Sequence, residues 1–181
     1  MKSSYRNALV TVICVVMIIG GVSGCASPTK STGMIVNDAQ IQKQHPHSVK
    51  ISVEGGSATD PVGFPAVPNE AFAEAVANSI AESKLFSEII EGDGGDYLLK
   101  INIFSIEHQP IGFNLTSHME VGWNLDNAVT GKQVMRKAIR SSNTATAGEA
   151  FAAVTRMRLA TEGAARKNIR EGIQEISKLD L

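Results

Sequence analysis

The spacing of apolar residues changes from one segment of the chain to the next, and this constrains the fold most strongly. Two segments repeat apolar residues every three or four positions, which predicts amphipathic helices over residues 69–86 and 148–178. The second segment is either one long helix or two abutting ones. Four segments instead alternate apolar with polar residues, a period that predicts half-buried strands at residues 49–53, 97–104, 113–125 and 134–142.

The resulting order, β-α-β-β-β-α, predicts an α+β fold. A strand-helix-strand unit followed by an antiparallel meander favours a two-layer sandwich, with a four-stranded mixed sheet and two helices on one face. The core between the layers is expected to hold Phe72, Val76, Tyr97, Ile101, Trp123, Ile169 and Ile173.

The opposite face of this sheet is expected to stay comparatively open. Alternation along the third predicted strand would direct a row of polar side chains to that face: Asn114, Thr116, His118, Glu120 and Asn124. We therefore expect one solvated face and one buried face.

The first 25 residues have the layout of a secretory signal peptide. Lys2 and Arg6 precede seventeen uncharged residues, 8–24, and small residues stand just before Cys25. An uncleaved membrane anchor is the alternative, although seventeen residues fall short of the roughly 20 that a spanning helix needs.

The sequence Val22-Ser23-Gly24-Cys25 resembles the lipobox of bacterial lipoproteins. The resemblance implies cleavage between Gly24 and Cys25, diacylglycerol on the Cys25 sulfur and acylation of the new amine. Two or more acyl chains would give stable membrane anchoring. Since no Asp follows Cys25, the common sorting rule implies the outer membrane. Cleavage would also remove Cys14, so the mature chain would keep no free thiol for a disulfide, a nucleophile or a metal site.

A length of 181 residues fits a single domain after this leader. We expect a signal peptide over residues 1–24, a lipid anchor and flexible tether over 25–47, and the α+β domain over 48–181. Within the tether, residues 34–36 are apolar, and an extra edge strand there is the alternative to a loose chain.

The layout as a whole resembles small outer-membrane lipoproteins of the lipopolysaccharide-assembly type, and the N-terminal domain of the Tol-system propeller protein. Beside the lipobox and the β-α-β-β-β-α order, the segments 85–88 with 96–99, and 123–126 with 130–131, resemble turns of uncharacterised lipoproteins of that layout. The resemblance implies a domain that binds another protein and performs no chemistry.

Charge is divided unevenly along the chain. The net charge of −1 argues against a nucleic-acid partner, which requires a concentrated cationic surface. Residues 51–130 carry twelve acidic and two basic side chains, whereas residues 131–181 carry ten basic and five acidic ones. Arg158, Arg166 and Arg170 share one helix face and are candidates for contact with an anionic partner. The alternative is a solvated face neutralised by the acidic half.

No catalytic, cofactor or metal motif stands out, so we expect no enzyme, no cofactor and no metal site. His45-Pro46-His47 has no third ligand nearby in sequence and is interpreted as solvated linker. His118 and Glu120 share a strand face but have no evident nucleophile. The prediction is a lipid-anchored periplasmic module that binds another envelope protein. The alternative is a lipid-binding or small-molecule-binding protein.

Overall fold

The computed structural model describes residues 27–60, 63–111 and 113–181, so the predicted cleavage site and Cys25 lie outside the described residues. The described helices and strands are, in chain order, α2 (Ser31–Met34), β1 (His45–Glu54), α3 (Asn69–Ser83), β2 (Phe86–Ile90), β3 (Tyr97–Ile111), β4 (Asn114–Asn127), β5 (Gln133–Ala145) and α4 (Ala153–Ile176).

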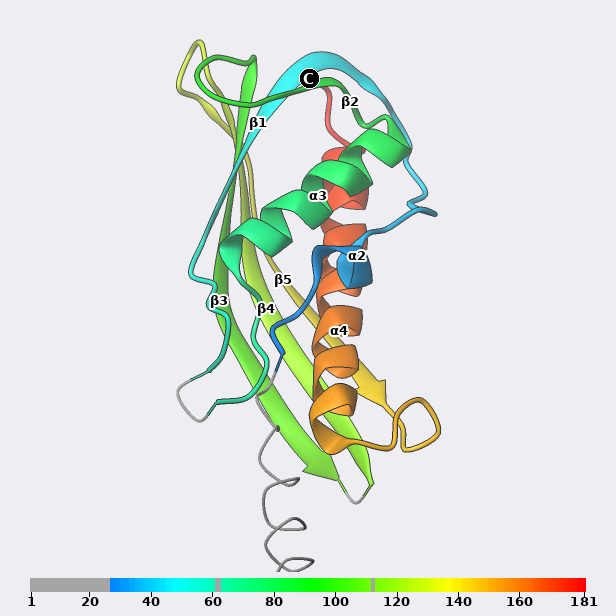
Figure 1. Ribbon diagram of the computed structural model, residues 1–181. Helices are drawn as coiled ribbons and strands as arrows, with labels where there is room; N and C mark the ends of the chain where they lie inside the picture. Colours follow the sequence, from blue (N-terminus) through cyan, green and yellow to red (C-terminus); the bar gives the residue numbers. More distant parts are fainter. Residues whose placement is uncertain (1–26, 61–62, 112) are drawn as a thin grey trace, which may run out of the picture.

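One sheet with the strand order β2-β1-β3-β4-β5 carries the fold. Strand β1 runs parallel to β2 and β3, while β3, β4 and β5 form an antiparallel meander. Helices α3 and α4 pack on the same side of this sheet, and no described helix covers its other side (Figure 1). The mixed sheet and the α+β class are thus as predicted.

The predicted number of strands is wrong, because the sheet has five strands and not four. The missed strand is β2, which begins at Phe86, where we expected the first long helix to be ending. Helix α3 stops at Ser83, and Lys84 adopts a left-handed conformation with φ 53° that reverses the chain. Glycine usually holds that position. Because the residue at this position is lysine and not glycine, the sequence did not indicate that the helix ends here. Leu85 and Phe86 also fit the apolar spacing of the predicted helix.

The core lies between the sheet and the two long helices. All seven residues expected in it are buried, as are most of the apolar side chains that β4 directs to the helices. The indole of Trp123 packs against the backbone of α4 at Gly172, so closely that a Cβ there would lie 2.6 Å from the ring. Helix and sheet are therefore closely packed at the centre of the domain.

The segment between residues 27 and 44 differs from the flexible tether that we expected. Met34, in α2, and Val36 are fully buried in the core, and the Val36 amide donates to Ser79 Oγ at 2.9 Å. The Lys30 amide donates to Glu162 Oε1 at 3.0 Å. The segment therefore packs on α3 and α4, as a short helix and not as the alternative edge strand. The few apolar residues of this segment show no regular period. Their burial therefore depends on the surface that α3 and α4 present to them, which the local sequence does not reveal.

His45, His47 and the proline between them belong to β1 and not to a solvated linker. His45 is buried, and its Nε2 lies 3.1 Å from the Ile176 carbonyl oxygen at the end of α4. The ring of His47 packs edge-on against Tyr97. Within the described ranges, no helix is both long and apolar enough to cross a membrane.

Candidate functional site

The uncovered face of the sheet brings polar side chains from three strands together. In the register of β3, β4 and β5, Ser105, Glu120 and Arg140 stand side by side in one row. The next row holds Glu107, His118 and Ser142. Because alternate residues of a strand point to the same face, both rows project away from α3 and α4.

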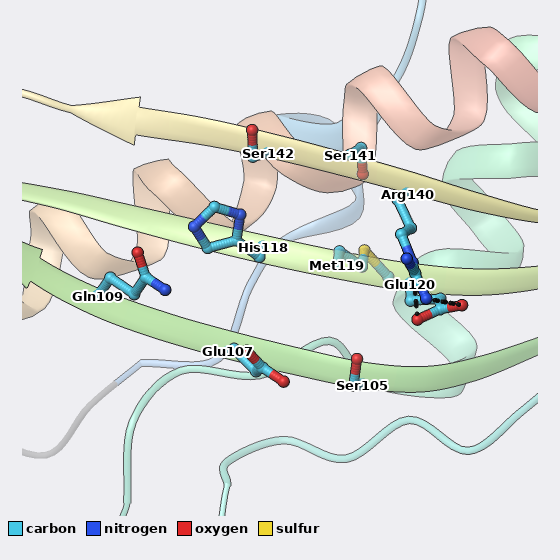
Figure 2. Close-up of a pocket in the computed structure, with 9 residues that line it drawn as sticks. All are labelled: Ser105, Glu107, Gln109, His118, Met119, Glu120, Arg140, Ser141 and Ser142. Atoms are coloured by element: carbon cyan, nitrogen blue, oxygen red, sulfur yellow. Dashed lines mark hydrogen bonds and ion pairs between the residues drawn. The ribbon is translucent and has the colours of Figure 1, made fainter.

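These rows form a shallow depression of about 450 Å³ (Figure 2). Nine residues line it: Ser105, Glu107, Gln109, His118, Met119, Glu120, Arg140, Ser141 and Ser142. We call it the open-face groove. Its floor is the pleated sheet itself, so its position is fixed by the strand register and does not depend on a loop.

An ion pair crosses one end of the groove. Arg140 Nε lies 3.1 Å from Glu120 Oε2, and Arg140 Nη2 donates to Glu120 Oε1 at 3.3 Å. The two residues are direct cross-strand partners, the arrangement in which opposite charges stabilise a sheet. Arg140 is largely exposed, so the pair adds only about 0–1 kcal/mol to stability. Its guanidinium keeps donors that can bind a carboxylate or carbonyl of another molecule.

His118 lies at the centre of the groove with an unused hydrogen-bonding atom. Its Nε2 is buried and has no hydrogen-bond partner among the described residues. A buried polar atom without a partner costs free energy, and a ligand or protein group that reaches it would recover that cost. Glu107 stands opposite His118, and Glu120 is paired with Arg140, but neither carboxylate makes a hydrogen bond to the imidazole.

The same face also exposes an aromatic ring. At a register shift between Ile103 and Ser105, Phe104 lies over Gly122, and a Cβ on that glycine would come 2.6 Å from the phenyl ring. More than half of Phe104 remains exposed. Aromatic residues are enriched where proteins bind one another.

The three candidate arginines of α4 make contacts within the chain itself. Arg158 pairs with Glu162 at 3.3 Å, and Arg170 pairs with Asp38 at 2.7 Å. Arg166 donates to the backbone oxygen of Gly33. The guanidinium of Arg170 beside Asp38 holds the pKa of that carboxyl below its usual value. The predicted basic face therefore lies against the packed segment 27–41, far from the open-face groove.

The paired histidines of β1 do not form a metal site with other described residues. His45 points into the core, and burial lowers the pKa of its imidazole. Across residues 27–60, 63–111 and 113–181, no three side chains of His, Cys, Asp or Glu gather closely enough to hold a metal ion.

Sequence reasoning found one strand of the site but missed the other two. It placed His118 and Glu120 on the open face, where the structure has them. Glu107 and Arg140 were missed because their neighbours are set by strand register. The β3–β4 register shifts at Phe104, and the β4–β5 register shifts between Leu125 and Asp126. The alternating pattern of 134–142, read against that of 113–125, is the signal from which the Glu120–Arg140 pairing could have been proposed.

The fold resembles that of several solved bacterial proteins. A protein of family DUF330 from Xanthomonas campestris is 12% identical, with a TM-score of 0.61 over 84% of this chain and 95% of its own. A hypothetical protein from Chlamydia trachomatis is 9% identical, with a TM-score of 0.55 over 76% and 100% of the two chains. A protein from Caulobacter crescentus, described as a lipoprotein, is 16% identical, with a TM-score of 0.51 over 72% and 88%.

At these identities the likeness establishes the fold alone. No family model matches the sequence, and no curated protein matches it. A fold similar to that of this chain thus occurs in other bacterial proteins, including one described as a lipoprotein.

Proposed function

We propose that this chain is a lipid-anchored protein of the bacterial envelope whose domain binds another envelope protein through the open face of its sheet. The observation that carries the proposal is the open-face groove, where the buried Nε2 of His118 lacks a partner. The free donors of Arg140 and the exposed ring of Phe104 supply polar and aromatic contacts on the same face. The partner is expected to offer carboxylate or carbonyl oxygens and an apolar side chain.

The anchor is proposed from the N-terminal sequence. A signal-peptide layout that ends in Val22-Ser23-Gly24-Cys25 supports acylation of Cys25, and the lack of Asp after it supports the outer membrane. The lipoprotein description of the Caulobacter neighbour agrees with such an anchor. A role in assembly or maintenance of the envelope, as in the lipopolysaccharide-assembly type that the layout resembles, is part of the proposal.

A binding role is favoured over catalysis by the chemistry of the groove. His118 makes no hydrogen bond to a carboxylate or hydroxyl that it could orient or activate, and Glu120 is engaged by Arg140. We propose accordingly that the chain is no enzyme and needs no cofactor.

The alternative, a lipid-binding or small-molecule-binding protein, needs a cavity between helices and sheet. Four depressions on the described surface are open to solvent, and of the seven expected core residues only Ile101 lines one of these four. Close packing of Trp123 on Gly172 also argues against space for a ligand there.

Site-specific photocrosslinking in intact cells tests the proposed face. A photoreactive phenylalanine analogue replaces Gln109 or Ser142 in the groove, and Asn78, exposed on α3, is the matched position on the other layer. The proposal expects one discrete protein adduct from positions 109 and 142, and none of that size from 78. Equal adducts from all three positions, or adducts with lipid alone, would contradict it.

Charge variants then test whether the groove itself makes the contact. Arg140→Glu places a carboxylate opposite Glu120 and should weaken the adduct from position 142 about tenfold, the loss expected for a charged contact worth about 1.5 kcal/mol. Arg140→Ala removes the ion pair without repulsion and should weaken it less. If both variants crosslink like the wild type, the groove is not the binding surface.

A further inference from the structure

Three phenylalanines are exposed at the end of the domain where the described chain begins. Phe151 is 100% exposed, Phe113 is 81% exposed and Phe64 is 43% exposed. Single exposed apolar side chains are common on proteins, but several large ones at one end mark a contact surface. We refer to these three residues as the aromatic end.

Strand register places Phe113 and the loop that carries Phe151 at this same end. Phe113 stands at the tip of the β3–β4 hairpin, next to the pair Ile111–Asn114. Leu115 pairs with Ala145, so the loop that follows β5 and carries Phe151 leaves the sheet beside that tip. In Figure 1 the hairpin and this loop both lie at the lower end of the molecule.

The loops that carry the other two phenylalanines are tied down. The ring of Phe64 packs edge-on against His108 at 5.8 Å, and His108 pairs with Ser117 in the same hairpin. Arg156 donates through Nη1 to the carbonyl oxygens of Ala150 and Phe151, at 2.8 and 2.6 Å. Phe64 through its ring, and Phe151 through its backbone carbonyl, thus contact the folded domain.

The predicted lipid would emerge beside the aromatic end. Thr29 donates through its amide and its hydroxyl to the Ala66 carbonyl oxygen, at 3.4 and 2.9 Å, two residues from Phe64. Thr29 is the fourth residue after Cys25, and an extended chain of four residue steps spans at most about 14 Å. A lipid on Cys25 would thus hold this end, and not the turn between β4 and β5, close to the bilayer.

The charge of these segments indicates which part of the membrane they suit. Residues 57–60, 63–67, 113–116 and 144–152 contain no lysine or arginine and two acidic residues. These segments therefore offer anionic headgroups no cationic side chain, whereas burial of aromatic rings among headgroups and upper acyl chains would be favourable.

We propose that the aromatic end inserts into the interfacial layer of the phospholipid bilayer and fixes the orientation of the domain on the membrane. This inference rests on the proposed anchor at Cys25 and adds a second, non-covalent contact. Such a contact would hold the sheet and its open-face groove roughly upright on the membrane, in place of a domain that tumbles on a tether.

Fluorescence quenching by brominated phospholipids tests the orientation. The full lipidated chain is reconstituted into phosphatidylcholine vesicles whose acyl chains carry bromine. The variants Phe113→Trp and Phe151→Trp each place a fluorescent indole at the aromatic end. Val129→Trp is the matched control, because Val129 is 83% exposed but lies in the β4–β5 turn at the opposite end. Trp123 is fully buried and contributes the same background to every variant.

Quenching at positions 113 and 151 should exceed that at 129 about twofold or more, because only the former would reach the acyl chains. The quenching should not change in 0.5 M salt, where a Debye length of about 4 Å screens attraction between charged groups. This control separates insertion of the rings from attraction to the headgroups. Vesicle flotation is measured on the same samples. Flotation with equal, weak quenching at all three positions overturns the orientation but leaves the anchor intact. Failure to float contradicts the anchor at Cys25, and the orientation with it.

Discussion

The indole N–H of Trp123 donates to Oδ1 of Asn168 at 2.9 Å, and both residues are fully buried between sheet and helix. The amide nitrogen of the same asparagine donates to the Ile139 carbonyl oxygen at 2.9 Å. One side chain of α4 therefore joins β4 to β5.

Asn168→Leu should lower the free energy of unfolding by about 1–3 kcal/mol for each of the two groups left without a partner. Those groups are Trp123 Nε1–H and the Ile139 carbonyl oxygen. Chemical denaturation measures the loss, and Asn78→Leu, an exposed position on α3, is the control expected to change little. Equal effects of the two substitutions would show that the buried bridge contributes nothing.

Gly172→Ala should destabilise the domain by about 1–3 kcal/mol, the range for overpacked cores. The new Cβ would lie 2.6–2.7 Å from three atoms of the rigid Trp123 indole, so helix or ring has to shift. Gly148→Ala is the matched control, since its nearest neighbour, Thr146 Oγ1, would be 3.7 Å away. If Gly172→Ala unfolds at the same melting temperature as the wild type, α4 does not approach the sheet this closely.

Met34→Ala tests whether the N-terminal segment is packed or loose. Met34 is fully buried against the core, so its truncation should cost about 2–5 kcal/mol. Thr32→Ala, at an exposed position of the same short helix, should have little effect. If unfolding of Met34→Ala matches the wild type, residues 27–44 are a flexible tether after all, and the orienting role of the aromatic end loses its support.

Reversal of Arg170 should loosen the same segment locally. In the wild type, Arg170 Nη2 lies 2.7 Å from Asp38 Oδ1. Arg170→Glu replaces this ion pair with two neighbouring carboxylates, which repel each other. Because the pair is partly exposed, the global loss should stay within about 1 kcal/mol. Hydrogen exchange should speed up in residues 30–41, whereas Lys132→Glu, in the β4–β5 turn, should leave that segment unchanged. Unchanged exchange in both would contradict the contact.

Stability should fall as the pH is lowered through the range just below 6.5. Burial lowers the pKa of His45 from its usual 6.5, with the Ile176 carbonyl partly opposing it, and burial also lowers the pKa of His108. Below pH 6.5 the unfolded chain therefore binds more protons at these two histidines than the folded chain does. Their burial does not lower the free energy of unfolding above pH 6.5, but it lowers that free energy increasingly as the pH falls below 6.5. His45→Gln should flatten this dependence in denaturation curves at several pH values. A slope equal to that of the wild type would contradict the burial of His45.

Most of the fold could be predicted because its strands and helices carry a clear period. The alternation around Trp123 gave the buried and open faces of β4, and the helical spacing of Ile169 and Ile173 gave the inner face of α4. Strand β2 could not be predicted in this way, because five residues are too few to show a period beside the apolar end of α3.

Contacts that depend on three-dimensional fit were beyond the sequence. The burial of Met34 depends on a surface that α3 and α4 create together, so its local pattern carries no signal. The open-face groove was half predicted: His118 and Glu120 follow from alternation, whereas Arg140 joins them only through the register of β5. The use of Arg166 and Arg170 within the chain likewise follows from where residues 27–41 pack.

Attachment through Cys25 is the central claim, because both the envelope role and the orientation on the membrane rest on it. The most direct measurement is mass spectrometry of the N-terminal peptide, from protein extracted from envelopes with detergent and digested. The account predicts a peptide that begins at Cys25 and carries two or more acyl chains, with Cys25→Ala left as uncleaved or soluble chain. A peptide that retains residues before Cys25, or begins there with an unmodified thiol, would contradict it.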